Sequence, residues 1–472
     1  MRVGPLTVGT LFDWEPIPGK TVSWHPTPAT LERVANAPVS SVPVSYMQAQ
    51  HIRGYVDQKA KGLDYSRLMI ISCDQPGRCD LRAVNYVVNA HVRRHDTYRS
   101  RFEYTEDDRI VRRTLPDPAD IEFAPVKHGE LTLDEIRDLA VNTPDPLQWG
   151  CFQFGVIQGD ESFTFYASVD HVHVDAMIVG ITLMEFHMMY GSLVGGGAPL
   201  ELPPAGSYDE FCIRQRHFTD SLTAQSPQVR AWTEFAERNG GSLPQFALPL
   251  GDTSKPSQAE MVTMTMLDEA QTAQFESNCR DAGARFIGGV LACCGLAERE
   301  LTGADTYYGL TPRDTRKTAA DALTQGWFTG LIPITVPIAD SSFEDAARAA
   351  QQSFDTDVHL AEVPYDRVVE LAPTVHKPRP NFPVINFLDA GTAPLSVLLT
   401  AELDGLNIGV YSDGRYSYQM SIYVIRVEQE TAVTVMYPDN PEAQESVERY
   451  LVALKSVFSR VAESGHWRRN VA

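Results

Sequence analysis

The stretch Asp170-His171-Val172-His173-Val174-Asp175 gathers four ionisable side chains where two predicted elements meet. Before it, residues 152–170 alternate apolar and polar positions around Gln158-Gly159-Asp160-Glu161, a pattern that predicts a β-hairpin. After it, an apolar run from about Ala176 to Tyr190 predicts a buried helix. The junction therefore presents its polar side chains at the end of a strand.

Three interpretations fit this segment. In the first, it is a polar turn in which Asp175 caps the following helix. In the second, His173 and Asp175 are two ligands of an iron site, which would need a distant third histidine. In the third, His171 is a general base, because an imidazole titrates near neutral pH, and Asp175 shapes the turn.

The chain around this segment reads as two halves of mixed strand and helix. A buried strand is predicted at Arg67–Ser72, Asp80 is placed to cap a helix, and a second hairpin covers Arg101–Val111. Glycine and proline mark a connector over 221–260. Beyond it we expect helices at 268–282, 286–301 and 442–462, strands near residues 307, 332, 385 and 397, and three strands over 406–435.

Composition narrows the class of protein. The 472 residues carry 61 acidic and 40 basic side chains, a formal net charge of −21, which argues against sequence-independent binding to nucleic acid. No window can span a bilayer, and the N-terminal residues lack the pattern of a secretory signal. The seven cysteines show no metal-ligand spacing, so we expect a reduced, cytoplasmic protein.

His171 and Asp175 match the His-x-x-x-Asp signature of the superfamily of chloramphenicol acetyltransferases, condensation domains and polyketide-associated acyltransferases, and the chain resembles this superfamily along nearly its whole length. Six more segments resemble family motifs and occur in the family order. They are Ser45–Gln50, Arg94–Phe102, Ser207–Phe211, Gly326–Ile334, Glu362–Asp366 and Pro383–Phe387. The sequence as a whole is most similar to mycobacterial polyketide-associated acyltransferases that esterify trehalose.

The resemblance implies an α/β (α+β) fold of two chloramphenicol-acetyltransferase-like subdomains with mostly antiparallel sheets and the active site at their interface. We assign residues 1–220 to the N-terminal subdomain, 221–260 to the connector and 261–472 to the C-terminal subdomain. Condensation domains usually carry His-His before the spacer, whereas this chain has Asp170-His171. This departure favours acylation of a hydroxyl over formation of a peptide bond.

The implied activity is O-acyl transfer of a long-chain acyl group from acyl-CoA to a hydroxyl of trehalose, in biosynthesis of acylated trehalose glycolipids. His171 would be the base, Asp175 would orient the motif loop, and no covalent acyl-enzyme would form. A buried Asp175 needs a cationic partner, and the family position suggests Arg316, with Arg313 as the neighbouring alternative.

We expect acyl-CoA as co-substrate, with no cofactor or metal. The expected partners are acyl-CoA and trehalose, with a polyketide synthase carrier domain as the alternative donor. The alternative activity is condensation-type or wax-ester-type transfer to an amine or a lipid alcohol. We also expect a monomer that associates at most peripherally with the inner face of the membrane.

Overall fold

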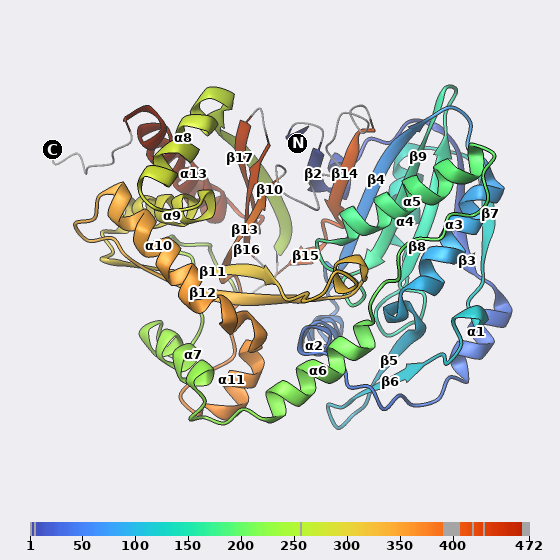
Figure 1. The fold of residues 1–472 in the computed structure, drawn as a ribbon, viewed down its shortest axis with the longest axis horizontal. Helices are drawn as coiled ribbons and strands as arrows, with labels where there is room; N and C mark the ends of the chain where they lie inside the picture. The colour runs from blue at the N-terminus through green and yellow to red at the C-terminus, as the bar shows by residue number, and fades with distance from the viewer. Residues whose placement is uncertain are drawn as a thin grey trace. The chain divides into compact units, whose positions relative to one another are not determined.

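The computed structural model describes residues 2–3, 6–254, 257–389, 406–417, 420–427 and 430–464. These residues form two compact units, drawn as one ribbon in Figure 1. Unit 1 comprises the described residues of 1–220, 316–328 and 397–414, and unit 2 those of 221–315, 329–396 and 415–472. Two stretches that the sequence analysis grouped with the C-terminal subdomain thus belong to unit 1, and 221–254 belongs to unit 2.

Unit 1 is built around a mostly antiparallel sheet whose described strands run in the order β1-β2-β14-β4-β9-β8-β3-β7. The pairing of β14 with β2 is parallel, and the other pairings are antiparallel. The strands are β1 (Arg2–Val3), β2 (Leu6–Thr10), β3 (Gly19–Pro26), β4 (Leu68–Pro76), β7 (Phe123–Leu131), β8 (Phe152–Gln158), β9 (Ser162–Asp170) and β14 (Ile408–Ser412).

Helices of unit 1 cover this sheet on both sides of β9, which explains why β9 is almost wholly buried. The rings of Phe165 and Phe186, in α5 (Ile178–Val194), stack at 3.9 Å between centroids. On the opposite face of the sheet, the Ser168 hydroxyl donates to the carbonyl oxygen of Ala140 in α4 (Leu133–Val141) at 2.9 Å. Figure 1 shows α5 beside α3 (Leu81–Arg94), which it contacts.

Several local predictions for unit 1 are confirmed. The predicted strand at Arg67–Ser72 is β4, and the Asp80 side chain caps α3 by accepting the N–H groups of Arg82 and Ala83 at 2.8 and 3.2 Å. The two predicted hairpins are β8–β9 and the pair β5 (Ser100–Tyr104) and β6 (Ile110–Thr114).

Unit 1 contains three further helices in the described part of the chain. They are α1 (Pro28–Ala35), α2 (Tyr46–Ala60) and α6 (Tyr208–Asp220), with short 3-10 turns at η1 (Leu11–Asp13), η2 (Asp96–Arg99), η3 (Pro118–Asp120) and η4 (Asp321–Leu323).

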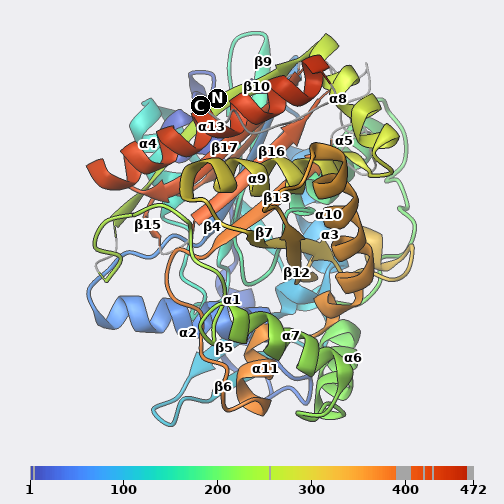
Figure 2. The ribbon, with the colours of Figure 1, turned by 90° about the vertical axis from the view of Figure 1, so that its left-hand side faces the viewer.

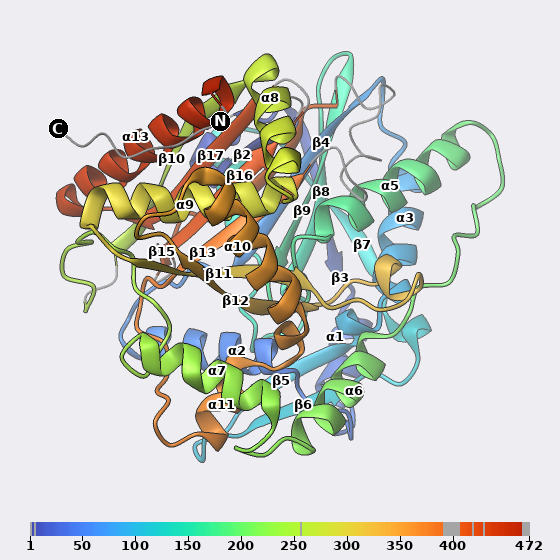
Figure 3. The same cartoon turned by 60° about the vertical axis from the view of Figure 1, so that its left-hand side comes forward.

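Unit 2 contains a second sheet with the described strand order β13-β16-β17-β10-β15. Helices α8, α9 and α13 lie on the near side of this sheet in Figure 2, and Figure 3 shows α10 alongside β12 of a separate β11–β12 hairpin. The strands are β10 (Ser257–Asp268), β11 (Thr306–Asp314), β12 (Thr329–Pro337), β13 (Pro383–Asp389), β15 (Tyr416–Ser417), β16 (Met420–Arg426) and β17 (Glu430–Pro438). The helices are α7 (Pro227–Arg238), α8 (Glu269–Asp281), α9 (Phe286–Thr302), α10 (Phe343–Asp357), α11 (Tyr365–Leu371) and α13 (Pro441–Ser464), with a 3-10 turn η5 (Val358–Glu362).

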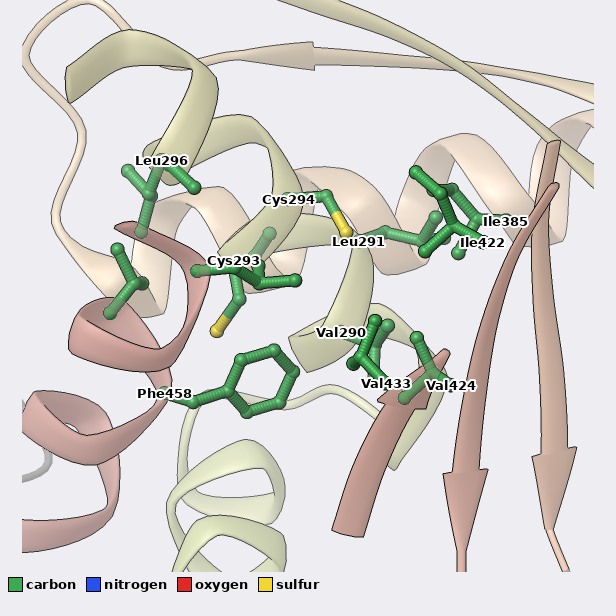
Figure 4. Close-up of a cluster of buried hydrophobic side chains, with 14 of the residues drawn as sticks. Val290, Leu291, Cys293, Cys294, Leu296, Ile385, Ile422, Val424, Val433 and Phe458 are labelled. Carbon is green, nitrogen blue, oxygen red and sulfur yellow. The ribbon is translucent and has the colours of Figure 1, made fainter. Parts of the chain in front are cut away.

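The core of unit 2 forms around the apolar helix α9 (Figure 4). Its adjacent cysteines, Cys293 and Cys294, are fully buried among side chains of the sheet and of α13. Burial raises the pKa of the Cys294 thiol to about 12, and it raises the pKa of the Cys293 thiol well above its usual value. Because a thiol is nucleophilic only as the thiolate, these two cysteines serve as small core residues.

The predicted strands over 406–435 are confirmed as β14, β16 and β17, but they do not all belong to one sheet. Strands form there, but β14 pairs with β2 and β4 in the sheet of unit 1, whereas β16 and β17 belong to the sheet of unit 2. Local sequence predicts that a strand exists, whereas its partner depends on contacts hundreds of residues away. The strand predicted near Val397 lies outside the described residues. Within the described ranges, no helix is long and apolar enough to cross a membrane.

Candidate active site

The motif segment is a tight turn between β9 and α5. Its first residue, Asp170, ends β9, and the His171 N–H donates to the carbonyl oxygen of Arg67 at 2.9 Å. The N–H groups of His173 and Val174 donate back to the carbonyl oxygens of Asp170 and His171 at 3.0 and 3.3 Å. These bonds hold the backbone of His171 next to the start of β4 and the end of β9.

The His171 ring is half-buried and lies against Trp327, with 3.9 Å between ring centroids and 29° between planes. The pKa of His171 is lowered to about 4, mainly by burial and also by the nearby His51, which together outweigh the opposing effects of its own main-chain carbonyl, Asp175 and Asp170. Its Nδ1 atom is buried without a hydrogen-bond partner among the described residues. The ring is therefore neutral at pH 7.

Asp175 and Arg316 form a buried, two-pronged ion pair. Arg316 donates from Nη1 to Oδ2 at 2.9 Å and from Nη2 to Oδ1 at 3.2 Å, and the two side chains are only 3% and 4% exposed. The carboxylate also accepts the N–H of Phe328 at 2.9 Å and of Met177 at 3.0 Å. Asp175 thus ties the start of α5 to residues 316–328.

The segment that follows Arg316 brings Trp327 to the site. The Arg316 guanidinium lies 4.1 Å from the centroid of the Phe328 ring, and it donates to carbonyl oxygens of Asp321 and Thr324. At Gly326, a Cβ atom would overlap the ring of Tyr208, so glycine is required by the close approach. Trp327 is therefore placed by its two neighbours in the chain as well as by the ion pair.

Asp170 holds a second imidazole beside the turn. Its side chain is fully buried, with Oδ1 2.9 Å from Nε2 of His51 and Oδ2 3.1 Å from Nη1 of Arg67. The N–H of Val172 also donates to Oδ1, at 2.9 Å. Burial by itself would raise the pKa of the Asp170 carboxyl, but His51 and Arg67 hold it below its usual value.

His173 points to a different environment from Asp175. Its Nδ1 lies 3.1 Å from Oγ1 of Thr97, and its ring packs against Tyr98, Phe102 and Phe152. The partners of Asp175 are instead Arg316 and main-chain N–H groups. The interpretation of these two residues as ligands of one iron centre therefore finds no support in their placement, because they do not converge with a third ligand in the described part of the chain.

Three other buried residues do converge as metal ligands would: His91, His95 and Glu185 offer atoms within 4.8 Å of one another. Hydrogen bonds already use them, since Glu185 lies 2.7 Å from Nδ1 of His91, 3.2 Å from Nε2 of His95 and 2.7 Å from Nε of Arg94. The Gln325 N–H donates to Nδ1 of His95 at 3.3 Å, which makes that nitrogen an acceptor. This cluster is a hydrogen-bonded network in which two histidines and an arginine surround a buried carboxylate.

Segments that resemble family motifs meet in unit 1 although they are far apart in sequence. Gln48 donates from Nε2 to the carbonyl oxygen of Val172 at 2.9 Å, within the motif turn. Asp96 accepts the N–H of Tyr208 at 2.9 Å, and the Tyr208 hydroxyl donates to the carbonyl oxygen of Trp327 at 3.2 Å. These bonds link Ser45–Gln50 to the turn, and they link Arg94–Phe102 through Tyr208 to Trp327 in Gly326–Ile334.

The structure brings together the three site residues named from the sequence. His171 and Asp175 share the turn, and Arg316, rather than the exposed Arg313, contacts Asp175. His51 and Trp327 were not predicted from the sequence, although His51 follows one quoted segment and Trp327 lies in another. Only their position beside His171 distinguishes them from ordinary core residues.

The site thus has a histidine at the end of a strand and, four residues later, a buried aspartate in an ion pair. The condensation domain model matches residues 40–468, and the chain belongs to this family.

The chain is similar to several mycobacterial acyltransferases. Acyltransferase PapA3 of Mycobacterium tuberculosis is 74% identical over 472 residues, covering all of both chains. The 2'-acyl-2-O-sulfo-trehalose (hydroxy)phthioceranyltransferase PapA1 of the same species is 55% identical, over 98% of this chain and 90% of that protein. The solved structure of PapA2 acyl transferase is 52% identical with a TM-score of 0.94, over 97% of this chain and all of that one; the PapA2 of Mycobacterium bovis is called a trehalose-2-sulfate acyltransferase.

Proposed function

We propose that this enzyme moves a long-chain acyl group from the thioester of acyl-CoA to a hydroxyl of trehalose, with His171 as general base. The observation that carries the proposal is the half-buried, neutral His171 ring at the end of β9, in a chain 74% identical to an acyltransferase. The names of PapA1 and PapA2 support a trehalose-type acceptor.

The chemistry requires one base and no covalent bond between the acyl group and the enzyme. His171 takes the proton of the sugar hydroxyl as its oxygen attacks the thioester carbonyl, which forms the ester C–O bond. The C–S bond then breaks, and the same ring returns the proton to the departing thiolate. Because Nδ1 is buried, Nε2 is the nitrogen that performs these transfers.

In this proposal Asp175 and Arg316 are positioning residues. Their ion pair fixes the turn that carries His171 and the segment that carries Trp327, and neither side chain is exposed to a substrate. A buried carboxylate fully engaged by a guanidinium and two N–H groups has no free capacity to act as a base.

The base is tested by His171→Ala, which we expect to lower turnover by about 10² to 10⁴ fold while the protein stays folded. His187→Ala is the matched control, since His187 is an exposed histidine of α5. Turnover in His171→Ala equal to that of the control would refute the assignment.

The acceptor is tested by incubating the protein with palmitoyl-CoA and, separately, trehalose, trehalose-2-sulfate, an amino sugar and a long-chain alcohol, with mass spectrometry of the products. We expect acyl esters of trehalose and no amide. Esters of the sulfated sugar alone would move the acceptor to the class named for PapA1 and PapA2. An amide or a wax ester as the main product would replace the proposal by the condensation-type or wax-ester-type alternative.

The donor is tested in the same assay by offering the palmitoyl group on the phosphopantetheine of a polyketide synthase carrier domain. Faster transfer from acyl-CoA supports the proposal, and transfer only from the carrier would overturn the choice of donor.

A further inference from the structure

A second histidine, from a different element, lies beside the proposed base. His51 comes from α2, and its ring centroid is 6.4 Å from that of His171 and 5.6 Å from that of Trp327. The His51 ring meets Trp327 edge-on at 68°, while Trp327 stacks on His171. The three rings therefore form one contiguous group in which Trp327 touches both histidines.

The orientation of His51 is fixed by a buried carboxylate. Asp170 pairs with Arg67, so it is ionised and can only accept hydrogen bonds. Nε2 of His51, 2.9 Å from Oδ1 of Asp170, must therefore carry a hydrogen. Nδ1 is then the nitrogen left to face away from the carboxylate, as in the carboxylate–imidazole pairs that orient histidines in enzyme active sites.

Asp170 links the two imidazoles mechanically. Its side chain holds His51, and its main chain continues directly into His171. The Val172 N–H closes the turn onto the same carboxylate oxygen. A displacement of this turn would thus move His171 and the anchor of His51 together.

We propose that His51 is a positioning residue of the acyl-transfer site: its ring, fixed by Asp170, braces Trp327 against His171 and places a second ionisable group beside the base. This inference rests on the proposed function. It also gives a role to Asp170, which stands where condensation domains carry the first histidine of a pair. In this chain the second imidazole near the base comes from α2 instead of from the preceding residue.

The charge of His51 acts on His171 together with its other neighbours. His51 opposes protonation of His171, whereas the carboxylates of Asp170 and Asp175 favour it. Arg67 pairs with Asp170, and Arg316 pairs with Asp175. If both rings carried a proton, their like charges would repel each other across 6.4 Å between ring centroids. Removing His51 should therefore raise the pKa of His171 by on the order of one pH unit.

The test compares His51→Gln and His51→Phe with the wild-type protein. Gln keeps a donor for Asp170 and Phe keeps the ring shape, but both remove the ionisable group. We expect the acid limb of kcat/KM to shift upward by on the order of one pH unit in both, and the plateau of kcat to fall by about tenfold or more. His25→Gln is the control, because His25 is a half-buried histidine of β3 that is hydrogen-bonded to Ser23 at 2.6 Å.

A second readout is independent of turnover. In protein with isotope-labelled histidine, the His171 resonance is identified by its loss in His171→Gln, and its titration is then followed in each His51 variant. The same upward shift is expected there. Folded variants in which neither the titration of His171 nor the pH profile moves would overturn this inference. If the wild-type protein acylates no acceptor while the His51 variants still show the shifted titration of His171, the proposed function alone is overturned.

Discussion

The ion pair between Asp175 and Arg316 should dominate the stability of unit 1 among its charged contacts, and Arg316→Met tests this. The substitution removes both bonds to the carboxylate, the donors to the carbonyl oxygens of Asp321 and Thr324, and the cation over Phe328. Asp175 would keep only two main-chain donors while remaining buried. Loss of one partner of such a pair costs about 3–5 kcal/mol of the free energy of unfolding.

Urea denaturation followed by circular dichroism measures this cost, and acyl transfer by the same samples measures its effect on the site. Arg348→Met is the matched control, because Arg348 pairs with Asp345 on the surface, with 59% and 63% of the side chains exposed. We expect little change in that control.

A double-mutant cycle isolates the pair itself. Asp175→Asn combined with Arg316→Met should cost less than the sum of the two single changes, by roughly 0.5–3 kcal/mol, since the double variant leaves no buried charge unpaired. Additive costs, or an Arg316→Met variant as stable as Arg348→Met, would refute the view that this contact fixes residues 316–328 to the turn.

Two further results are expected. Gly326→Ala should destabilise the protein by about 1–3 kcal/mol and reduce turnover, because the new Cβ overlaps the Tyr208 ring; Gly54→Ala, with open space at its Cβ, is the control, and equal melting temperatures would contradict the expectation. Burial lowers the pKa of His173 to about 4, so the unfolded chain binds this proton first and stability should fall as the pH drops from 6.5 to 4. His173→Phe should reduce that slope by up to about 1.4 kcal/mol per pH unit, measured as the free energy of unfolding at each pH, and an unchanged slope would show that His173 does not contribute.

Local features of this fold could be predicted from sequence because their causes are local. Asp80 caps α3 through the next few N–H groups, and the β8–β9 hairpin is set by alternation around a short polar turn. The position of His171 at the end of β9 follows from the same hairpin and the apolar helix after it. The pairing of Asp175 with Arg316 needed the family resemblance, since 141 residues separate the two.

Other parts of the site have no local signature. His51 lies on α2 among other polar residues, and its partner Asp170 is 119 positions away. Trp327 reads as one more aromatic in an apolar segment until its stacking on His171 is seen. Nor could β14 be assigned to the sheet of unit 1, because a short apolar strand fits many edges equally well.

The place of β14 has a consequence for synthesis on the ribosome. β14 is the strand that joins β2 to β4, yet it is made about 400 residues after β2. β14 begins about 330 residues after β4 ends, so at 5–20 residues per second the growing chain waits roughly 17–66 s with the hydrogen-bonding edge of β4 open. A nascent chain that carries an open apolar edge for this long is exposed to intermolecular pairing, so chaperone protection during translation should matter more for this protein than for one whose sheets close in chain order.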